Sequence, residues 1–239
     1  MSQRIQDRLR LAGIDCSSLS DEQLAAAFRE VLEGGMHGLC FSPYKGDQKP
    51  GSKLSTDQIQ ERLNVIQPYT KWIRSFSCTE GNELIPKIAK ENGLKTLVGA
   101  WLGDDDKVNQ QEIENVIEIA RAGHADMVAV GNEVMYRGDL EEGELIAFIE
   151  RVREALPDMP VGYVDAYYEF TDRPAITSAC NIVMANCYPY WERCGIDYSQ
   201  LYAKEMYRQA VKAAGGKKVI VTESGWPSAG TPLGGAEPS

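Results

Sequence analysis

The chain has 239 residues, of which 43% are hydrophobic and 8% aromatic, and its formal net charge is -10. This length permits one α/β domain with a sizeable core, so we expect a single domain over residues 1–239. The acidic balance leaves no basic stripe to neutralise phosphates, and no apolar run approaches the roughly 18 to 20 residues of a membrane span, so neither nucleic acid nor a membrane is an expected partner.

The N-terminal segment, MSQRIQDRLR, contains no apolar signal core. The sequence as written therefore predicts a cytoplasmic protein, or a secreted or periplasmic one if a leader has been clipped off. The residues before Gly34 have the apolar spacing of a helix, at Leu24, Ala27, Phe28, Val31 and Leu32. We expect 1–34 to form a helical cap that covers the N-terminal side of the domain.

From about Met36 onward, seven short apolar or β-branched runs follow one another along the chain. Most of them are too continuously apolar to have one face in solvent, so they predict buried parallel strands. The runs are GLCFSPY (38–44), WIRSFS (72–77), TLVGAWL (96–102), MVAVGNE (127–133), VGYVDAY (161–167), IVMANCYPY (182–190) and VIVTESGW (219–226).

Segments with helical periodicity separate these runs, the clearest containing Ile113, Val116 and Ala120. The alternation predicts right-handed βαβ crossovers, and the spacing of the strands suits a (β/α)₈ barrel of the TIM type better than a doubly wound sheet. An eighth strand would begin roughly 20 to 40 residues beyond Val219. The eighth β/α unit is therefore predicted to be missing, because the C-terminal end is truncated or because the barrel closes in another way.

The six cysteines include no C-x-x-C pair. Cys40, Cys78 and Cys187 lie inside apolar runs, where cysteine commonly packs as a small hydrophobe. Reduced structural thiols are therefore favoured over disulfides.

Polar and aromatic residues follow the predicted strands at their C-terminal ends, where barrel enzymes carry their chemistry. Aromatic rings stack on pyranose faces while Asp, Asn and Arg bind hydroxyls, so this mixture indicates an oligosaccharide or polysaccharide substrate. The residues are Tyr44, Arg74, Trp101, Asp104, Asn132, Glu133, Asp165, Tyr167, Tyr188, Tyr190, Glu223 and Trp226.

Glu133 and Glu223 emerge abruptly from hydrophobic strands. A buried carboxylate is costly unless it is paired or used. Hydrolysis of a glycosidic bond with retention needs a carboxylic acid and a carboxylate about 5 to 5.5 Å apart. The fourth and seventh strands face each other across a barrel mouth and could present such a pair; the alternative is that each glutamate is a structural ion-pair partner at the rim.

At these positions the sequence resembles glycoside hydrolase family 17, the β-1,3-glucanases of a large clan of retaining (β/α)₈ hydrolases. The similarity covers nearly the whole chain from about Met36 and looks closest to bacterial members. It rests on GLCFSPY and on WIRSF (72–76), AVGNEV (129–134), NCYPYW (186–191) and VTESGWPS (221–228).

The resemblance implies that Glu133 is the general acid/base and Glu223 the nucleophile. Arg74 and Tyr188, which match the family, would hold Glu223 by hydrogen bonds, and Asn132 would bind the sugar 2-hydroxyl.

Five further residues at the mouth are expected to bind substrate: Tyr44, Trp101, Asp165, Tyr190 and Trp226. For Trp226 the alternative is that it locks a turn with Pro227, and for Asp165 that it merely ends its strand. No metal and no cofactor are expected, because the acidic run at 104–106 lacks the glycine and spaced ligands of a calcium loop and the two histidines lie at the opposite rim.

We therefore predict a retaining glycoside hydrolase that cleaves laminarin-type β-1,3-glucan by double displacement. A β-1,3-glucanosyltransferase stays open, because transfer and hydrolysis share one covalent intermediate. A non-catalytic glucan-binding protein also stays open, because an incomplete barrel would loosen the strand that carries Glu223. A Schiff-base aldolase and a phosphate-binding isomerase are disfavoured, because no lysine ends a strand and no glycine-rich phosphate loop follows the seventh.

Overall fold

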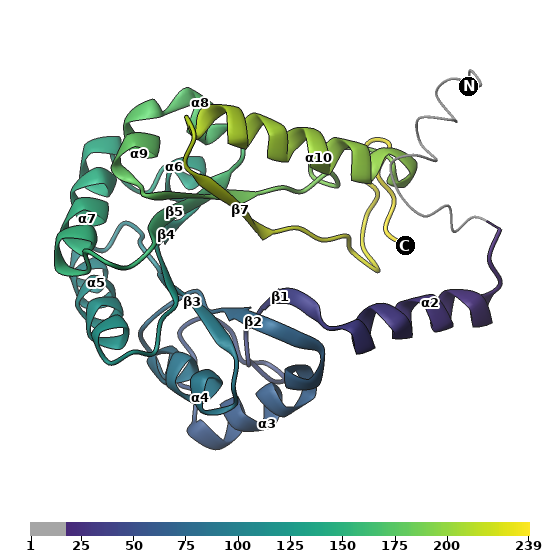
Figure 1. Cartoon of the computed structure of the whole chain (residues 1–239), viewed down its shortest axis with the longest axis horizontal. Helices are drawn as coiled ribbons and strands as arrows, with labels where there is room; N and C mark the ends of the chain where they lie inside the picture. The colour runs from purple at the N-terminus through teal and green to yellow at the C-terminus, as the bar shows by residue number, and fades with distance from the viewer. Residues whose placement is uncertain (1–17) are drawn as a thin grey trace.

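The structure, a computed structural model, describes residues 18–239. Its centre is a seven-stranded parallel sheet in the order β1-β2-β3-β4-β5-β6-β7. The sheet curls into a nearly closed barrel of the (β/α)₈ type (Figure 1), and all seven predicted strands are confirmed. The strands are β1 (Met36–Cys40), β2 (Thr70–Arg74), β3 (Lys95–Ala100), β4 (Met127–Asn132), β5 (Val161–Ala166), β6 (Ile182–Asn186) and β7 (Lys218–Glu223).

Helices connect successive strands and lie around the outside of the barrel (Figure 1). The longer ones are α3 (Thr56–Ile66), α4 (Ile85–Glu91), α5 (Asp106–Arg121), α7 (Glu142–Ala155), α9 (Pro174–Ala179) and α10 (Ile196–Ala213). Short turns of helix are η1 (Gln67–Tyr69), η2 (Asn82–Leu84), α6 (Val134–Arg137) and α8 (Glu169–Asp172). In α5 the predicted positions Ile113, Val116 and Ala120 are buried, as the periodicity requires.

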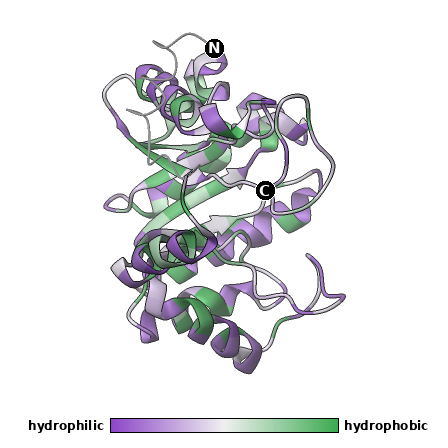
Figure 2. Cartoon of the chain, turned by 90° about the vertical axis from the view of Figure 1, so that its right-hand side faces the viewer, coloured by the Kyte–Doolittle hydropathy of each residue, from purple (hydrophilic) through white to green (hydrophobic). Residues whose placement is uncertain are grey.

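The two faces of the sheet carry separate sets of apolar side chains, because successive residues of a strand point to opposite faces. Val161 and Tyr163 of β5 belong to the large core between strands and helices, whereas Val164 packs with residues of the opposite face. Figure 2 shows the strands as mainly hydrophobic ribbons and the helices as two-sided. This alternation decides which strand-end residues reach the barrel mouth.

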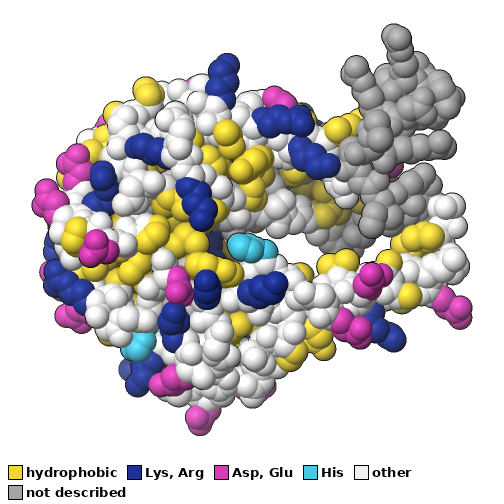
Figure 3. All heavy atoms as spheres, in the orientation of Figure 1, with side chains coloured by type: hydrophobic (Ala, Val, Ile, Leu, Met, Phe, Trp, Pro, Cys, Tyr) yellow, Lys and Arg dark blue, Asp and Glu magenta, His cyan; other side chains and the backbone are white. Residues whose placement is uncertain are grey.

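The edge strands β1 and β7 approach each other only at their C-terminal ends. Cys40 Sγ lies 3.4 Å from the carbonyl oxygen of Thr222, but the two strands share no ladder. The space-filling view shows an opening beside the inner end of α2 (Figure 3), and Val221 of the edge strand β7 is 44% exposed. Over residues 18–239 no eighth strand joins the sheet, in agreement with the prediction.

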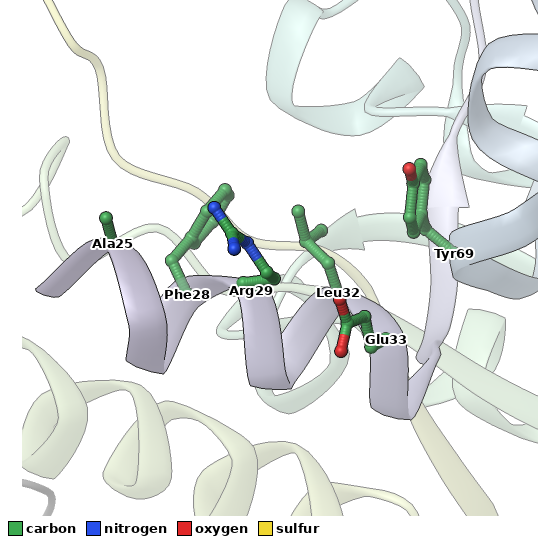
Figure 4. A pocket seen from close by; sticks show the side chains of 6 residues that line it. All are labelled: Ala25, Phe28, Arg29, Leu32, Glu33 and Tyr69. Carbon is green, nitrogen blue, oxygen red and sulfur yellow. The ribbon is translucent and has the colours of Figure 1, made fainter. Parts of the chain in front are cut away.

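The helix before β1 is α2 (Asp21–Gly34), and it starts at a capping box in which Ser20 and Gln23 exchange hydrogen bonds. It does not cover the barrel as expected: none of its residues is buried, and Phe28 is 65% exposed. Figure 1 shows α2 extending away from the barrel, and Figure 4 shows Tyr69 beside the C-terminal end of this helix. Its residues Ala25, Phe28 and Leu32 instead line a pocket with Tyr69 of η1. The first part of the predicted cap, 1–17, lies outside the described residues.

Candidate active site

The C-terminal ends of β4, β6 and β7 open into a cavity of about 650 Å³. Both glutamates predicted to be catalytic lie in its wall. The lining residues are Glu133, Tyr136, Ala166, Tyr167, Tyr168, Asn186, Tyr188, Trp191, Glu192, Met206 and Glu223. The strand-end rule therefore identified the position of the cavity from the sequence.

Glu223 ends β7 and is held by two donors from other strands. Arg74, at the end of β2, forms an ion pair with its Oε1 atom, and the Tyr188 hydroxyl donates to Oε2 at 2.8 Å. The side chains of Arg74 and Glu223 are only 5% and 13% exposed. These two contacts fix the orientation of the carboxylate, as the resemblance implied.

Arg74 also connects the two halves of the site. Its Nη2 atom donates to Asn132 Oδ1 at 2.6 Å, so one guanidinium holds both Glu223 and the residue that precedes Glu133. A planar guanidinium suits this task because its donors are fixed in a fork. Asn132 is 7% exposed, which places its amide at the edge of the barrel interior.

Glu133 follows β4 with a left-handed backbone, at φ 51°. This conformation is uncommon for a residue with a side chain and persists only where surrounding contacts hold it. The Glu133 amide donates to the carbonyl oxygen of Val164 at 2.8 Å, and the short helix α6 begins directly afterwards.

The Glu133 side chain is held by Asn186, which ends β6. Asn186 Nδ2 donates to Glu133 Oε1 at 2.9 Å, and Asn186 Oδ1 accepts from Thr222 Oγ1 at 2.9 Å. A chain of two hydrogen bonds thus runs from Glu133 to the neighbour of Glu223. Sequence reasoning missed Asn186, although it lies in the same run as Tyr188.

Asp165 does not lie where it was expected. It is fully buried on the helix-facing side of β5, the side of Tyr163, and its Oδ2 atom accepts a hydrogen bond from the Tyr163 hydroxyl. The Tyr163 oxygen in turn accepts from the Met135 amide at 2.9 Å. Burial raises the pKa of Asp165 to about 6. The expectation of direct sugar contact is corrected: Asp165 supports the backbone just after Glu133.

Trp101 also supports this backbone and does not line the cavity. The guanidinium of Arg137 lies 4.5 Å above the Trp101 ring, and Arg137 donates to the carbonyl oxygens of Asn132 and of Leu102, the latter at 2.8 Å. The expected sugar platform is therefore occupied on one face by a cation.

The remaining expected substrate-binding residues also stand outside the cavity lining. Tyr190 is 4% exposed and donates to the carbonyl oxygen of Thr231 at 2.8 Å. Trp226 packs edge-on against Tyr190 and donates to the carbonyl oxygen of Glu237 at 2.9 Å. Both aromatic residues thus pack with the C-terminal segment. Tyr44 lies elsewhere, with Asn82 Nδ2 at 3.4 Å from its hydroxyl.

Other aromatic side chains form the wall of the cavity. Tyr136, on α6, is 63% exposed and Trp191, just after β6, is 66% exposed, while Tyr167 and Tyr168 come from the segment after β5. We call these four residues the aromatic wall. Exposed rings beside two carboxylates suit a sugar ligand, since each ring offers an apolar face to a pyranose.

The described cysteines are free thiols, and one of them, Cys40, lies beside Arg74 of this site. Cys78, Cys180 and Cys187 are buried as free thiols, and burial raises the pKa of the Cys187 thiol to about 11. In the part of the chain that the structure describes, no three His, Cys, Asp or Glu side chains are grouped to hold a metal ion, and no helix is long and apolar enough to cross a bilayer.

The family model of the BtgE/BtgC glycoside hydrolase domain matches residues 38–239. The chain belongs to this glycoside hydrolase family. A glucan 1,3-β-glucosidase of Schizosaccharomyces pombe is 25% identical over 234 residues, which span 90% of this chain and 72% of that protein. A probable β-glucosidase of Aspergillus oryzae is 28% identical over 222 residues, 87% of this chain and 35% of the relative.

Solved structures place this glycoside hydrolase in family 17. The family 17 β-1,3-glucanosyltransferase of Rhizomucor miehei superposes with a TM-score of 0.76 at 28% identity, covering 85% of this chain and 76% of that one. An active-site mutant of the same enzyme, in complex with laminaritriose, gives 0.77 at 28% identity, with 87% and 77% covered. The predicted family and barrel are confirmed. These relatives are fungal and give no support to the expected closeness to bacterial members.

Proposed function

We propose that this glycoside hydrolase acts on β-1,3-linked glucan by double displacement, with Glu133 as general acid/base and Glu223 as nucleophile. The observation that carries the proposal is the shared cavity, where Glu133 and Glu223 are joined through Asn186 and Thr222. The relatives named glucan 1,3-β-glucosidase and the laminaritriose complex of the Rhizomucor enzyme support this substrate class.

In the first step, a carboxylate oxygen of Glu223 attacks C1 of the sugar in the cleaved linkage. The bond between C1 and the glycosidic oxygen breaks, and that oxygen takes the proton of Glu133 and leaves as an alcohol. The product is a covalent glycosyl ester on Glu223. Arg74 and Tyr188 keep the attacking carboxylate oriented. Holding a reacting group in the correct position lowers the activation barrier.

In the second step, Glu133 is a carboxylate and acts as a base. It takes a proton from water while the water oxygen bonds to C1, and the ester bond to Glu223 breaks with its electron pair returning to the carboxylate. Inversion at C1 occurs twice, so the anomeric configuration is retained. Both enzyme groups then stand in their starting protonation states.

Asn132 is proposed to bind the 2-hydroxyl of the sugar on Glu223. Its Oδ1 atom already accepts from Arg74, which directs the Nδ2 hydrogens away from that contact. Hydrogen bonds to the 2-hydroxyl strengthen in the transition state of glycoside hydrolysis. Tyr136 and Trp191 of the aromatic wall are proposed to stack on neighbouring sugar units, because their rings are the most exposed of the four.

Transfer to a second sugar in place of water is an alternative that one observation favours. The Rhizomucor family member of similar fold is described as a β-1,3-glucanosyltransferase. An aromatic wall next to the two glutamates could hold an acceptor sugar where water would otherwise attack. Products longer than the substrate, separated by mass, would identify transfer.

The place of action is proposed to be outside the cytoplasm. One relative, 27% identical over 222 residues, is a cell surface mannoprotein of Candida albicans. This relationship favours the secreted alternative over the cytoplasmic expectation. Fractionation of the source cells, with glucan-releasing activity assayed in medium, wall and cytosol, tests the assignment; activity confined to the cytosol would contradict it.

Release of reducing sugar from laminari-oligosaccharides tests the proposed function. The unsubstituted chain should release sugar, and both Glu223→Ala and Glu133→Ala should lower the rate by at least about a hundredfold. Glu205→Gln, on the exposed side of α10, is the matched control and should leave the rate unchanged. Binding of the oligosaccharide by the unsubstituted chain with neither release of reducing sugar nor formation of longer products would overturn the proposal and favour a glucan-binding protein.

A further inference from the structure

The two carboxylate oxygens of Glu133 have different surroundings. Oε1 accepts a hydrogen bond from Asn186 Nδ2 at 2.9 Å, and the Asn186 side chain is 3% exposed. For Oε2 no such bond to a described residue is found, and Glu133 lines the cavity. One oxygen is therefore held by the barrel interior and the other is available to the cavity.

Thr222 holds the end of the Asn186 amide that points away from Glu133. Its hydroxyl donates to Asn186 Oδ1 at 2.9 Å, which leaves Nδ2 to face Oε1. A flipped amide would turn its carbonyl oxygen toward Glu133, and the Thr222 hydroxyl would then accept from Asn186 where it now donates. An asparagine amide presents donors at one end and acceptors at the other, so its orientation decides what the glutamate can do.

We propose that Asn186, held in place by Thr222, is a positioning residue that assigns the transferable proton of Glu133 to Oε2. This assignment rests on the proposed function. A proton on Oε1 would point at the N–H of Asn186, so two donors would face each other. The neutral acid therefore carries its proton on Oε2, from which it passes to the glycosidic oxygen. In the second step the same oxygen takes the proton from water.

A flipped Asn186 would reverse this arrangement. Its carbonyl oxygen would accept a proton from Oε1 and hold that proton inside the barrel, away from the glycosidic oxygen. The orientation of the Asn186 amide thus decides between a delivered and a withheld proton. Thr222 precedes Glu223 on β7, so the residue beside the nucleophile also holds the residue that positions the proton of the acid.

A purely structural role for Asn186 would affect all substrates alike, and leaving-group dependence separates the two possibilities. A phenyl glycoside of a β-1,3-linked oligosaccharide needs a proton on its leaving oxygen, whereas the 2,4-dinitrophenyl glycoside of the same sugar leaves as a stable anion. The ratio kcat/KM reports the steps up to the glycosyl-enzyme, where this proton is used. Both glycosides would be assayed with the unsubstituted chain and with each variant.

Asn186→Leu should lower kcat/KM for the phenyl glycoside by about ten- to hundredfold and for the dinitrophenyl glycoside by no more than about threefold. Thr222→Val should shift the same ratio in the same direction by a smaller factor, and Thr222→Ser, which keeps the hydroxyl, should restore it. Circular dichroism and thermal unfolding verify that each variant is folded. If Asn186→Leu does not fold, the Thr222 pair carries the test alone.

Equal losses on both glycosides, or no loss on either, in Asn186→Leu or in Thr222→Val would overturn the assignment of the proton to Oε2. Such a result would leave the proposed function intact, because the unsubstituted chain would still cleave both glycosides. Cleavage of neither glycoside by the unsubstituted chain would overturn the proposed function, and the proton assignment with it.

Discussion

Tyr188 donates its hydroxyl hydrogen to Oε2 of Glu223 across 2.8 Å. Burial, and then the negative charge of Glu223, raise the pKa of Tyr188 well above its ordinary value, so the phenol stays a donor at neutral and moderately alkaline pH. Through this hydrogen bond, a residue that follows β6 holds the proposed nucleophile at the end of β7.

Tyr188→Phe should therefore lower kcat on laminari-oligosaccharides by about ten- to hundredfold, because the attacking carboxylate loses one of its two fixing contacts. Steady-state kinetics measure the effect, and Tyr207→Phe, on the exposed surface of α10, is the matched control. A kcat equal to that of the control would exclude a role for this hydroxyl in the reaction.

Arg74→Met should destabilise the fold by about 3 to 5 kcal/mol, because it leaves the little-exposed Glu223 carboxylate without its cation. The double variant Arg74→Met/Glu223→Gln should recover part of this loss, because neither charge remains. Urea denaturation of the four proteins gives the free energies of unfolding. Simple addition of the two single effects would show that the ion pair is not energetically coupled.

Asp165 predicts a pH dependence of stability. Burial raises its pKa from 3.8 to about 6, so the folded chain binds this proton more tightly than the unfolded chain does. The contribution of this proton to the free energy of unfolding is present in full below about pH 4. It is lost as the pH rises to about 6, and the free energy does not change further on this account above that pH. This contribution amounts to about 3 kcal/mol as an upper estimate.

Asp165→Asn should remove this component. Denaturation at a series of pH values would show the free energy of unfolding of the unsubstituted chain declining relative to that of the variant between about pH 4 and 6, with a constant difference above. The comparison isolates Asp165, because Glu112, another buried carboxyl whose pKa is raised by burial, is present in both proteins. Parallel curves throughout that window would contradict the raised pKa.

Trp191→Ala should weaken substrate binding and leave stability almost unchanged. The ring is 66% exposed and lines the cavity. Its removal should therefore abolish stacking on a sugar and disturb the core packing little. We expect KM for laminari-oligosaccharides to rise about tenfold, with kcat within about threefold. Calorimetric titration of the oligosaccharide into the Glu223→Gln background checks the affinity; an unaltered dissociation constant would exclude Trp191 from the binding surface.

The strands could be predicted because their residues are apolar on both faces. The run 182–186 is buried throughout, and such a run is typical of a parallel strand covered on both sides. The two glutamates were found because each interrupts an apolar run at a strand end. The position of α2 could not be predicted. Its apolar periodicity shows that one side of the helix is apolar, but not which surface that side packs against.

The residues predicted to bind substrate lie outside the cavity lining for a related reason. A strand-end residue faces the barrel interior or the helices according to its parity, and Asp165 shares the helix-facing side with Tyr163. Asn186 has the parity of Met184, which packs on the opposite face, and this signal was present in the sequence. Tyr190 and Trp226 pack with the C-terminal segment, which folds back onto them. Contacts with such an irregular segment leave no periodic pattern in the sequence.

Double displacement requires a covalent bond between Glu223 and C1 of the sugar. A 2-deoxy-2-fluoro-β-laminaribiosyl fluoride slows both steps but keeps an activated leaving group, so the intermediate should accumulate and raise the intact mass by one fluorinated disaccharide unit. Peptide mapping should place this unit on Glu223 and find none in Glu223→Gln. A label on any other residue, or an unlabelled protein that has cleaved the reagent to a product of inverted configuration, would contradict the assignment of Glu223 as nucleophile.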